Sequence, residues 1–178
     1  MIEIALFEPE IPPNTGNIIR LTVCSGTGLH IVGQPSFSLE DSMLRRAGLD
    51  YYALSRLTSH NDFDSFVEFL SQRDGQSRHE ILARICLFTR FATNSYAEHR
   101  FRYDQIILFG KETTGLPPGI LDRFAHRKEQ LLRIPVHQNC RSLNLANSVS
   151  IVLYEGLRQL GFPGLDRSYV ADTDTDVP

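Results

Sequence analysis

Phe109-Gly110-Lys111-Glu112-Thr113-Thr114-Gly115-Leu116-Pro117 is the stretch that decides the fold class of this chain. It continues a compact apolar run that is typical of a buried strand. A second stretch, Arg133-Ile134-Pro135 leading to Arg141-Ser142-Leu143-Asn144-Leu145-Ala146-Asn147-Ser148, has the same form. The sheets of α/β proteins expose backbone N–H and C=O groups to small ligands where their strands end. We therefore expect both stretches to form the floor of one binding site.

Strand-like runs alternate with amphipathic segments along the rest of the chain, which predicts a parallel α/β sheet flanked by helices. The expected strands are Ile2–Phe7, Leu29–Gly33, Leu54–Thr58, Ile85–Thr89, Gln105–Phe109 and Leu131–Pro135. The expected helices run from Asn14 or Thr15 to about Ser25, from Ser38 to Arg46, from His60 or Asn61 to about Gln72, and over Asn144–Gly161. The polar segment Asp74–Glu80 predicts a loop.

The last expected helix has an apolar stripe that is wider than packing on its own sheet requires. Its members are Leu145, Val149, Ile151, Val152, Leu153, Tyr154, Leu157 and Leu160. A stripe of this width usually contacts a second partner as well, so it favours a dimer.

The bulk composition fits a single globular domain. The chain has 178 residues, of which 42% are apolar, and we assign the domain to residues 1–164. No apolar run reaches the roughly 18 residues of a membrane span, and the first residues lack the pattern of a secretory signal. We expect Cys24, Cys86 and Cys140 to be reduced, buried apolar residues. These features favour a cytoplasmic protein with no membrane partner.

Charge and motifs exclude several functions without selecting one. The net charge of −3 comes from the acidic tail 165–178, whose composition predicts disorder. The remaining body is neutral, so charge neither supports nor excludes an RNA partner. The six histidines are scattered without metal-type spacing, so no metal site is expected. Gly26-Thr27-Gly28 lacks the third glycine of a dinucleotide fingerprint, and Gly110-Lys111 is followed by Glu112 instead of the Ser or Thr of a phosphate loop.

Three polar side chains stand at the expected site. Glu112 can receive a cation or a hydroxyl donor, or it can simply cap a helix. Ser142 and Asn144 precede the last helix, so they can cap it, or its unpaired N–H groups can bind a ligand. Ile134-Pro135 supplies an apolar wall and a free carbonyl, which suit a flat adenine ring.

Three separated blocks resemble the TrmL-type (YibK-type) RNA 2′-O-methyltransferases of the SPOUT superfamily. They are Pro9–Arg20, Phe109–Pro117, and Ile134-Pro135 through Leu145 into Tyr154-Glu155; Arg45–Tyr51 is also similar. The resemblance implies an α/β sheet whose C-terminal part forms a deep trefoil knot, within a homodimer. It also implies methyl transfer from S-adenosylmethionine to the ribose 2′-hydroxyl of the tRNA wobble nucleotide, a cytidine or a modified uridine. The alternatives are a related enzyme that acts on ribosomal RNA, or a cofactor- or RNA-binding scaffold without catalysis.

The resemblance also assigns roles to individual residues. The implied cofactor contacts are Phe88, Gly110, Ile134, Ser142 and Leu143. The implied catalytic residues are Arg20, Glu112, Ser142 and Asn144, and the implied RNA contacts are Asn14, Arg20, Arg45, Arg46 and Arg141. Deprotonating an arginine at pH 7 costs on the order of 8 kcal/mol. We therefore expect Arg20 to hold the target phosphate and hydroxyl, with Glu112 or Asn144 orienting Arg20 or the ribose.

The chain departs from the family pattern at three places. Arg90-Phe91 stands where a smaller, glycine-bearing turn is expected, Asp74–Glu80 looks like added length, and Lys111 replaces a frequent proline. These departures concern loop shape and the fit of RNA, not the expected cofactor site.

Overall fold

The computed structural model describes residues 1–38 and 55–166. Its described part contains a 7-stranded sheet with the order β3-β2-β1-β6-β4-β7-β5, in which every pairing is parallel. The strands are β1 (Glu3–Phe7), β2 (Gly28–Val32), β3 (Leu57–His60), β4 (Ile85–Phe88), β5 (Asn94–Ser95), β6 (Ile106–Phe109) and β7 (Leu131–Arg133). The prediction of a parallel α/β fold is confirmed.

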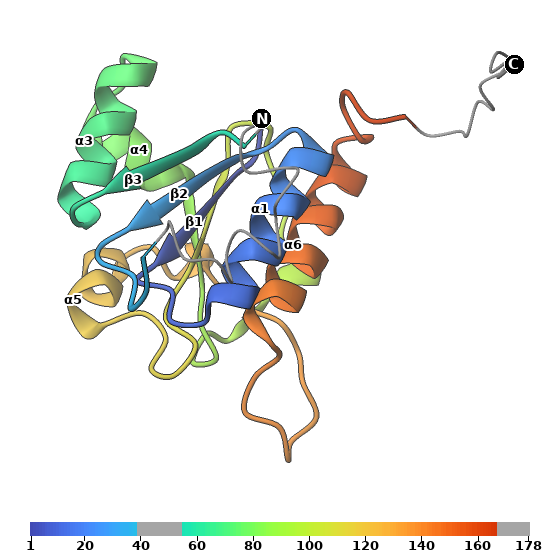
Figure 1. Ribbon diagram of the computed structural model, residues 1–178. Coiled ribbons are helices and arrows are strands. Elements are labelled where there is room, and N and C mark those ends of the chain that lie inside the picture. The colour runs from blue at the N-terminus through green and yellow to red at the C-terminus, as the bar shows by residue number, and fades with distance from the viewer. Residues whose placement is uncertain (39–54, 167–178) are drawn as a thin grey trace, which may run out of the picture.

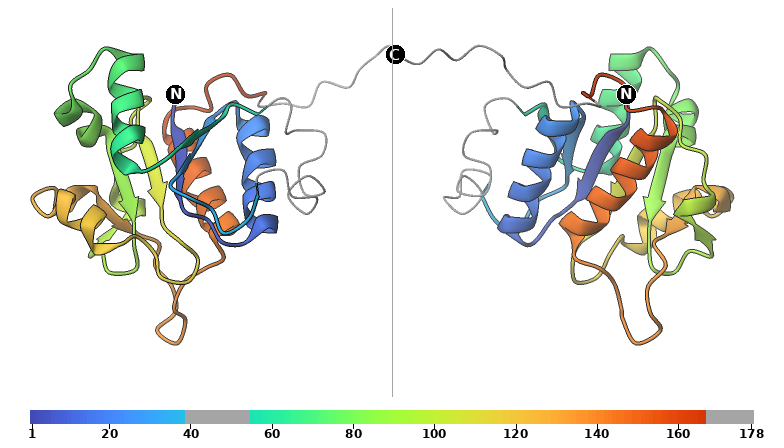
Figure 2. Two further views of the ribbon diagram at one scale, coloured as in Figure 1. Left: turned by 60° about the vertical axis from the view of Figure 1, so that its left-hand side comes forward. Right: turned by 90° about the vertical axis from the view of Figure 1, so that its right-hand side faces the viewer.

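Helices cover both faces of the sheet (Figure 1). They are α1 (Pro12–Ser25), α3 (Phe63–Asp74), α4 (Arg78–Arg84), α5 (Pro118–Leu121) and α6 (Leu145–Gln159), with short 3-10 turns at Tyr96–Glu98, Asp122–Phe124 and Lys128–Gln130. Helices α1 and α6 lie side by side on one face, and α3, α4 and α5 lie on the other (Figure 2). No helix of the described residues is long and apolar enough to cross a membrane.

The two faces follow from the alternation of side chains along each strand. In β1, Ile4 and Leu6 pack with residues of α1 and α6, whereas Ala5 and Phe7 pack with residues of α3 and α5. All four side chains are at most 9% exposed. A strand buried on both faces reads as a continuous apolar run, which is why the sequence identified it.

The start of α1 differs from the prediction. The helix begins at Pro12, ahead of the expected caps Asn14 and Thr15, and its N-cap residue Ile11 has no side chain that can cap it. The prolines in the first turn lack N–H groups, so they need no cap there. The helix ends as predicted, with Gly26 in the left-handed conformation at φ 66°.

The segment predicted as a loop, Asp74–Glu80, is mostly helical. Helix α3 continues to Asp74, and α4 begins at Arg78 after Ser77 and Glu80 form a capping box. The Ser77 N–H donates to the Glu80 carboxylate at 2.8 Å, and the Glu80 N–H donates to the Ser77 hydroxyl at 3.3 Å. The polar composition therefore reflects an exposed helix face and its cap, which the prediction overlooked.

Other predictions need smaller corrections. Strand β3 lies at Leu57–His60, a few residues later than expected. Cys86 is buried, but Cys24 and Cys140 are exposed, so their predicted burial is wrong. The helix expected over residues 38–46 and most of the tail 165–178 fall outside the described residues.

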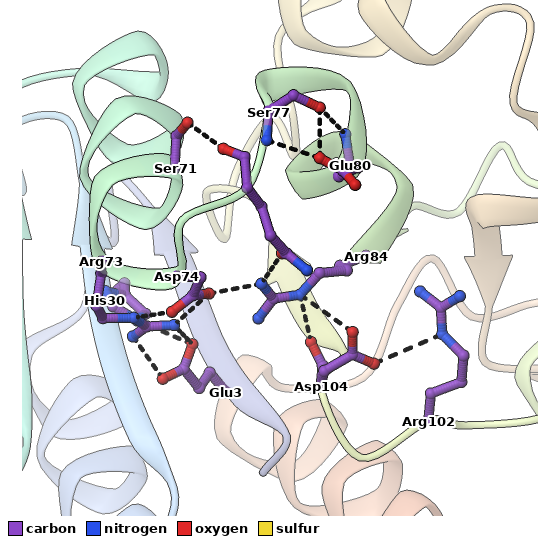
Figure 3. A network of polar contacts seen from close by, with 11 residues as sticks. Glu3, His30, Ser71, Arg73, Asp74, Ser77, Glu80, Arg84, Arg102 and Asp104 are labelled. Carbon is purple, nitrogen blue, oxygen red and sulfur yellow. Dashed lines mark hydrogen bonds and ion pairs between the residues drawn. The ribbon is translucent and has the colours of Figure 1, made fainter.

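A charged network holds the amino end of the sheet (Figure 3). The Arg73 guanidinium donates to both oxygens of Glu3 at 2.8 and 2.9 Å and pairs with Asp74 at 2.7 Å. The Arg84 guanidinium pairs with Asp74 at 2.5 Å and donates to the Asp104 carbonyl at 2.9 Å. The network connects β1, α3, α4 and the loop before β6. It lies at the amino ends of the strands, opposite the expected site.

Two histidines meet between β2 and β3, next to this network. The Nδ1 atom of His30 lies 3.0 Å from the Nε2 atom of His60, and both side chains are at most 7% exposed. Burial, followed by the nearby His30 and Arg73, lowers the pKa of His60 to about 4. Although burial opposes it, the nearby His30 ring and the hydrogen bonds from Arg73 lower the pKa of Glu3 to about 2, so Glu3 stays ionised where His60 titrates.

We predict that His60 makes the fold sensitive to acid. The unfolded chain binds a proton at this residue near pH 6.5, whereas folded His60 resists protonation down to about pH 4. The stabilisation is therefore complete above pH 6.5 and is lost as the pH falls towards 4, by roughly 2–3 kcal/mol. The variant His60→Gln retains a hydrogen-bonding partner for His30. Its free energy of unfolding, measured with urea, should therefore fall less between pH 6.5 and pH 4 than that of the wild type. The exposed His126→Gln is the control, and parallel pH profiles for all three proteins would contradict the prediction.

Gly110 is required by the chain's own backbone. A Cβ atom at this position would overlap the carbonyl carbon of Gly115 and the amide nitrogen of Leu116. The loop is folded back tightly there, since Lys111 and Gly115 exchange backbone hydrogen bonds of 3.2 and 3.0 Å. The missing side chain of Gly110 therefore makes room for the returning backbone, in addition to the cofactor contact that the resemblance implies.

We predict that Gly110→Ala destabilises the protein by about 1–3 kcal/mol, because neither backbone segment can move away cheaply. Gly119→Ala is the matched control, since a Cβ atom there meets nothing within 4 Å. In helix α5 this control should be neutral or stabilising by up to about 1 kcal/mol. Equal unfolding midpoints for the two variants in urea would refute the steric argument.

Candidate active site

A pocket of about 390 Å³ opens at the carboxyl ends of β4, β6 and β7. These strands are neighbours in the sheet, so the segments that follow them meet at one edge. Helix α1 follows β1 onto one face of the sheet, and α5 follows the adjacent β6 onto the other. Ligands of open α/β sheets bind at such a divergence between neighbouring strands.

The floor of the pocket is apolar. The rings of Phe88 and Phe109 stack with their centroids 4.9 Å apart and an interplanar angle of 23°. They are register partners at the ends of β4 and β6, so the ladder itself sets this stacking. Ile134 and Leu145 add apolar surface to the lining. The floor suits a flat ring that stacks or packs by dispersion.

Two carboxylates clamp the loop after β1 to the loop after β6. Glu112 accepts hydrogen bonds from the N–H groups of Glu10 at 2.8 Å and Ile11 at 3.2 Å. In return, Glu10 accepts from the Thr113 N–H at 3.0 Å and from its hydroxyl at 2.7 Å. These bonds from Thr113 lower the pKa of Glu10. The clamp also places the charge of Glu112 at the N-terminus of α1, where a negative charge is favourable.

Asn14 and Asn144 extend the clamp to the last helix. The side-chain amide of Asn14 donates to Glu112 at 3.0 Å, and that of Asn144 donates to the Asn14 oxygen at 2.9 Å. The Asn144 oxygen then accepts from the N–H groups of Ala146 at 2.9 Å and Asn147 at 3.3 Å. A carboxylate can only accept hydrogen bonds, so each side-chain amide in this series of hydrogen bonds has one orientation. The α6 N-terminus is thereby fixed relative to the other two loops.

The predicted cofactor residues come together. Phe88, Gly110, Ile134, Ser142 and Leu143 all line this pocket. Of the predicted catalytic residues, Glu112, Ser142 and Asn144 also line it. Arg20 does not: it lies on an exposed face of α1, and it has an interaction within the protein. Asn144 caps α6, so the capping alternative is correct for Asn144.

The predicted RNA contacts are divided. Both Arg141 and Asn14 line the pocket, but Arg141 is exposed, whereas Asn14 is only 5% exposed and uses its amide inside the protein. Arg45 and Arg46 lie outside the described residues. Arg123, on the other face of the sheet, pairs with Asp64 through bonds of 2.6 and 2.8 Å.

The sequence did not reveal the role of Glu10 or Thr113. Their mutual bonds span 103 positions of the chain, so no local spacing could indicate them. A weak signal was the start of α1, which has no acidic residue in its first turn and therefore favours a negative charge from elsewhere. Lys111 likewise pairs with Glu8, which no motif indicated.

The residues present fit a nucleoside-like cofactor. Apolar rings form the floor, and the N–H groups of Ser142 and Leu143 at the rim have no hydrogen-bond partner within the described part of the chain. These donors, beside an apolar floor, match the polar edge and flat faces of a purine. The described residues contain no group of three or more His, Cys, Asp or Glu side chains that could hold a metal ion.

Comparison with known proteins agrees with this geometry. Residues 1–154 match the model of the SpoU rRNA Methylase family. The chain is 43% identical over 164 residues to the tRNA (cytidine(34)-2′-O)-methyltransferase of Escherichia coli (strain K12), covering 92% of this chain and 97% of that protein. The same enzyme of Burkholderia pseudomallei (strain 1106a) is 41% identical, with 92% and 99% covered.

Solved structures share the fold. One, described as "Structural insights into the 2-OH methylation of C/U34 on tRNA", has a TM-score of 0.77 and 36% identity, covering 90% of this chain and 97% of its own. The AdoMet-bound rRNA methyltransferase from Sinorhizobium meliloti has a TM-score of 0.73 and 25% identity, covering 89% and 56%. The pocket at the carboxyl ends of the strands, the family model and the relatives agree, and the chain belongs to the SpoU methylase family.

Proposed function

We propose that the protein is an S-adenosylmethionine-dependent tRNA methyltransferase that methylates the ribose 2′-hydroxyl of the wobble nucleotide, a cytidine or a modified uridine. The observation that carries the proposal is the Glu112–Asn14–Asn144 chain, which joins three distant segments around one pocket. Relatives 43% identical over almost their whole length are named for this activity on cytidine 34. We also propose a cytoplasmic location, where tRNA is available, and the deep trefoil knot that the resemblance implies.

The pocket residues position the reactants in this proposal. S-adenosylmethionine supplies a methyl group already activated on a sulfonium, so alignment is the protein's main task. Holding two reactants in line can contribute roughly 7–11 kcal/mol. The stacked Phe88 and Phe109 rings, with Ile134, hold the adenine, and the N–H groups of Ser142 and Leu143 fix the polar edge of the cofactor. Glu112 and Asn144 act as positioning residues, because their atoms already bind other parts of the protein.

Arg20 joins this site through a homodimer in our proposal. It lies on an exposed face of α1, away from the pocket of its own protomer. The neighbouring helix α6 exposes Ile151 at 38% and Tyr154 at 42%, which are apolar side chains suited to an interface. Pairing two copies through the α1 and α6 face brings Arg20 of the partner subunit towards the pocket.

In this arrangement Arg20 holds the target phosphate and the attacking hydroxyl. A literal base would have to be deprotonated arginine, at a cost on the order of 8 kcal/mol at pH 7. A guanidinium instead offers several donors in a fixed plane, which suits a phosphate and a hydroxyl together. The hydroxyl proton then leaves to the phosphate or to water.

A second candidate substrate is ribosomal RNA. The family model is described as SpoU rRNA Methylase, and the solved Sinorhizobium meliloti enzyme is an rRNA methyltransferase. That enzyme is only 25% identical, and the chain covers 56% of its length. The tRNA relatives match over nearly their full length, so tRNA is the better-supported substrate.

We predict that the protein transfers label from methyl-labelled S-adenosylmethionine to unmodified tRNA at the wobble ribose. Arg20→Ala should lower the rate about 100-fold, since a charge-assisted hydrogen bond contributes about 1.5–3 kcal/mol. Arg78→Ala, on α4 across the sheet, is the control. Label only in ribosomal RNA would select the second candidate. Bound cofactor with no label in any RNA would leave the scaffold alternative.

We predict that Glu112→Gln lowers kcat/KM for tRNA by about 10- to 100-fold while the protein remains folded. Glutamine keeps one acceptor oxygen but places an NH2 group where the other oxygen stood, so some of the N–H donors lose their acceptor, and the charge at the start of α1 is removed. Glu10→Gln is the matched comparison, because it weakens the same clamp without touching Asn14. Equal effects of the two variants would mean that Glu112 acts only by joining the loops.

A further inference from the structure

Phe91 is the most exposed large apolar side chain of the described residues. It is 70% exposed and lies in the lining of the pocket, directly after the strand that supplies Phe88. An exposed aromatic ring beside a binding pocket offers apolar surface whose burial by a bound molecule is favourable.

Hydrogen bonds hold the backbone of the turn that carries Phe91. The Phe91 N–H donates to the Thr89 hydroxyl at 3.3 Å, and the Ala92 N–H donates to the Thr89 carbonyl at 3.3 Å. Thr89 is fixed in turn by its own N–H bond to the Leu132 carbonyl at 3.0 Å. Phe88 and Ala92, which bound the turn, are only 8% and 6% exposed. The ring is therefore presented by a short turn that begins after a buried strand residue and ends at a buried alanine.

The surroundings of the ring are cationic. The Arg90 guanidinium lies 4.7 Å from the centroid of the Phe91 ring and covers one of its faces. Arg133 and Arg141 line the same pocket. A ring with one free face among guanidinium groups suits an unpaired nucleobase joined to a phosphate backbone. A protein interface would instead need a continuous apolar surface around the ring.

We infer that Phe91 is a stacking platform for an unpaired base of the substrate RNA next to the methylated nucleotide, with Arg90 beside it for the phosphate. The inference rests on the proposed function, since it names how the same site holds its RNA. Stacking of a base on an aromatic side chain changes RNA affinity by about 5- to 150-fold. Phe91 takes no part in methyl transfer and sets only the position and affinity of the RNA.

The chain contains no tryptophan, so Phe91→Trp creates a protein with a single fluorescent indole at the platform. Titration with an unmodified tRNA anticodon stem–loop should quench this fluorescence, because a base stacks on the indole. Tyr103→Trp is the matched control: Tyr103 is 53% exposed, but it precedes β6 at the opposite edge of the sheet. Its fluorescence should change little.

Activity gives a second readout. Phe91→Leu keeps an apolar side chain but removes the ring, so we expect KM for tRNA to rise about 10-fold with kcat and cofactor affinity unchanged. Phe91→Tyr should restore the wild-type KM. A general disturbance of the turn would lower cofactor affinity, and tyrosine would then not rescue it.

Four results would overturn the inference. They are no quenching by the stem–loop, equal quenching by polyphosphate, quenching by S-adenosylmethionine alone, and a fluorescence change with protein concentration alone. The last would assign Phe91 to a contact between copies of the chain. Failure of the proposed function is distinguishable, because wild-type protein would then label no tRNA while the quenching experiment still reports whether RNA bases reach the ring.

Discussion

The carboxylate of Glu112 at the start of α1 is the contact on which the candidate site depends. Helix α1 begins with two prolines after Ile11, so its own residues supply neither a cap nor a charge for its positive end. Glu112 supplies the charge, and from the loop after β6 it accepts the N–H groups of Glu10 and Ile11 just before the helix. A local requirement of one helix thereby fixes two loops that are about a hundred positions apart in the chain.

The same carboxylate sets the direction of every hydrogen bond that follows. Because it can only accept, Asn14 must present its amide nitrogen to Glu112 and its oxygen to Asn144. Asn144 then has its own oxygen free for the first turn of α6. The segment that carries Ser142 and Leu143 is held at its helical end by this chain. Loss of the Glu112 charge would therefore also disturb the hydrogen bonds of N–H donors in α6 that Glu112 does not contact.

The sequence predicted what depends on local pattern. Continuous apolar runs such as β1 and β6 identified a sheet buried on both faces, and the residues after the strands identified the pocket. It failed where the cause is distant or polar: α4 was hidden by the composition of its exposed face, and the bonds of Glu10 cross 103 positions. The contact of His30 with His60 depends on the pairing of β2 with β3, which no spacing shows. The resemblance of the block Pro9–Arg20 indicated Arg20, but only the structure showed that Arg20 lies outside the pocket.

The amino ends and the carboxyl ends of the strands have different roles, and this difference explains why the pocket can remain open. At the amino edge, charged pairs such as Arg73 with Glu3 satisfy each other and tie the strands to α3 and α4. At the carboxyl edge, the Ser142 and Leu143 N–H groups lack partners in the described chain, and the Phe91 ring faces solvent. Groups left unsatisfied in this way contribute nothing to folding and are available for binding. The core and the amino edge must therefore carry the stability of the fold.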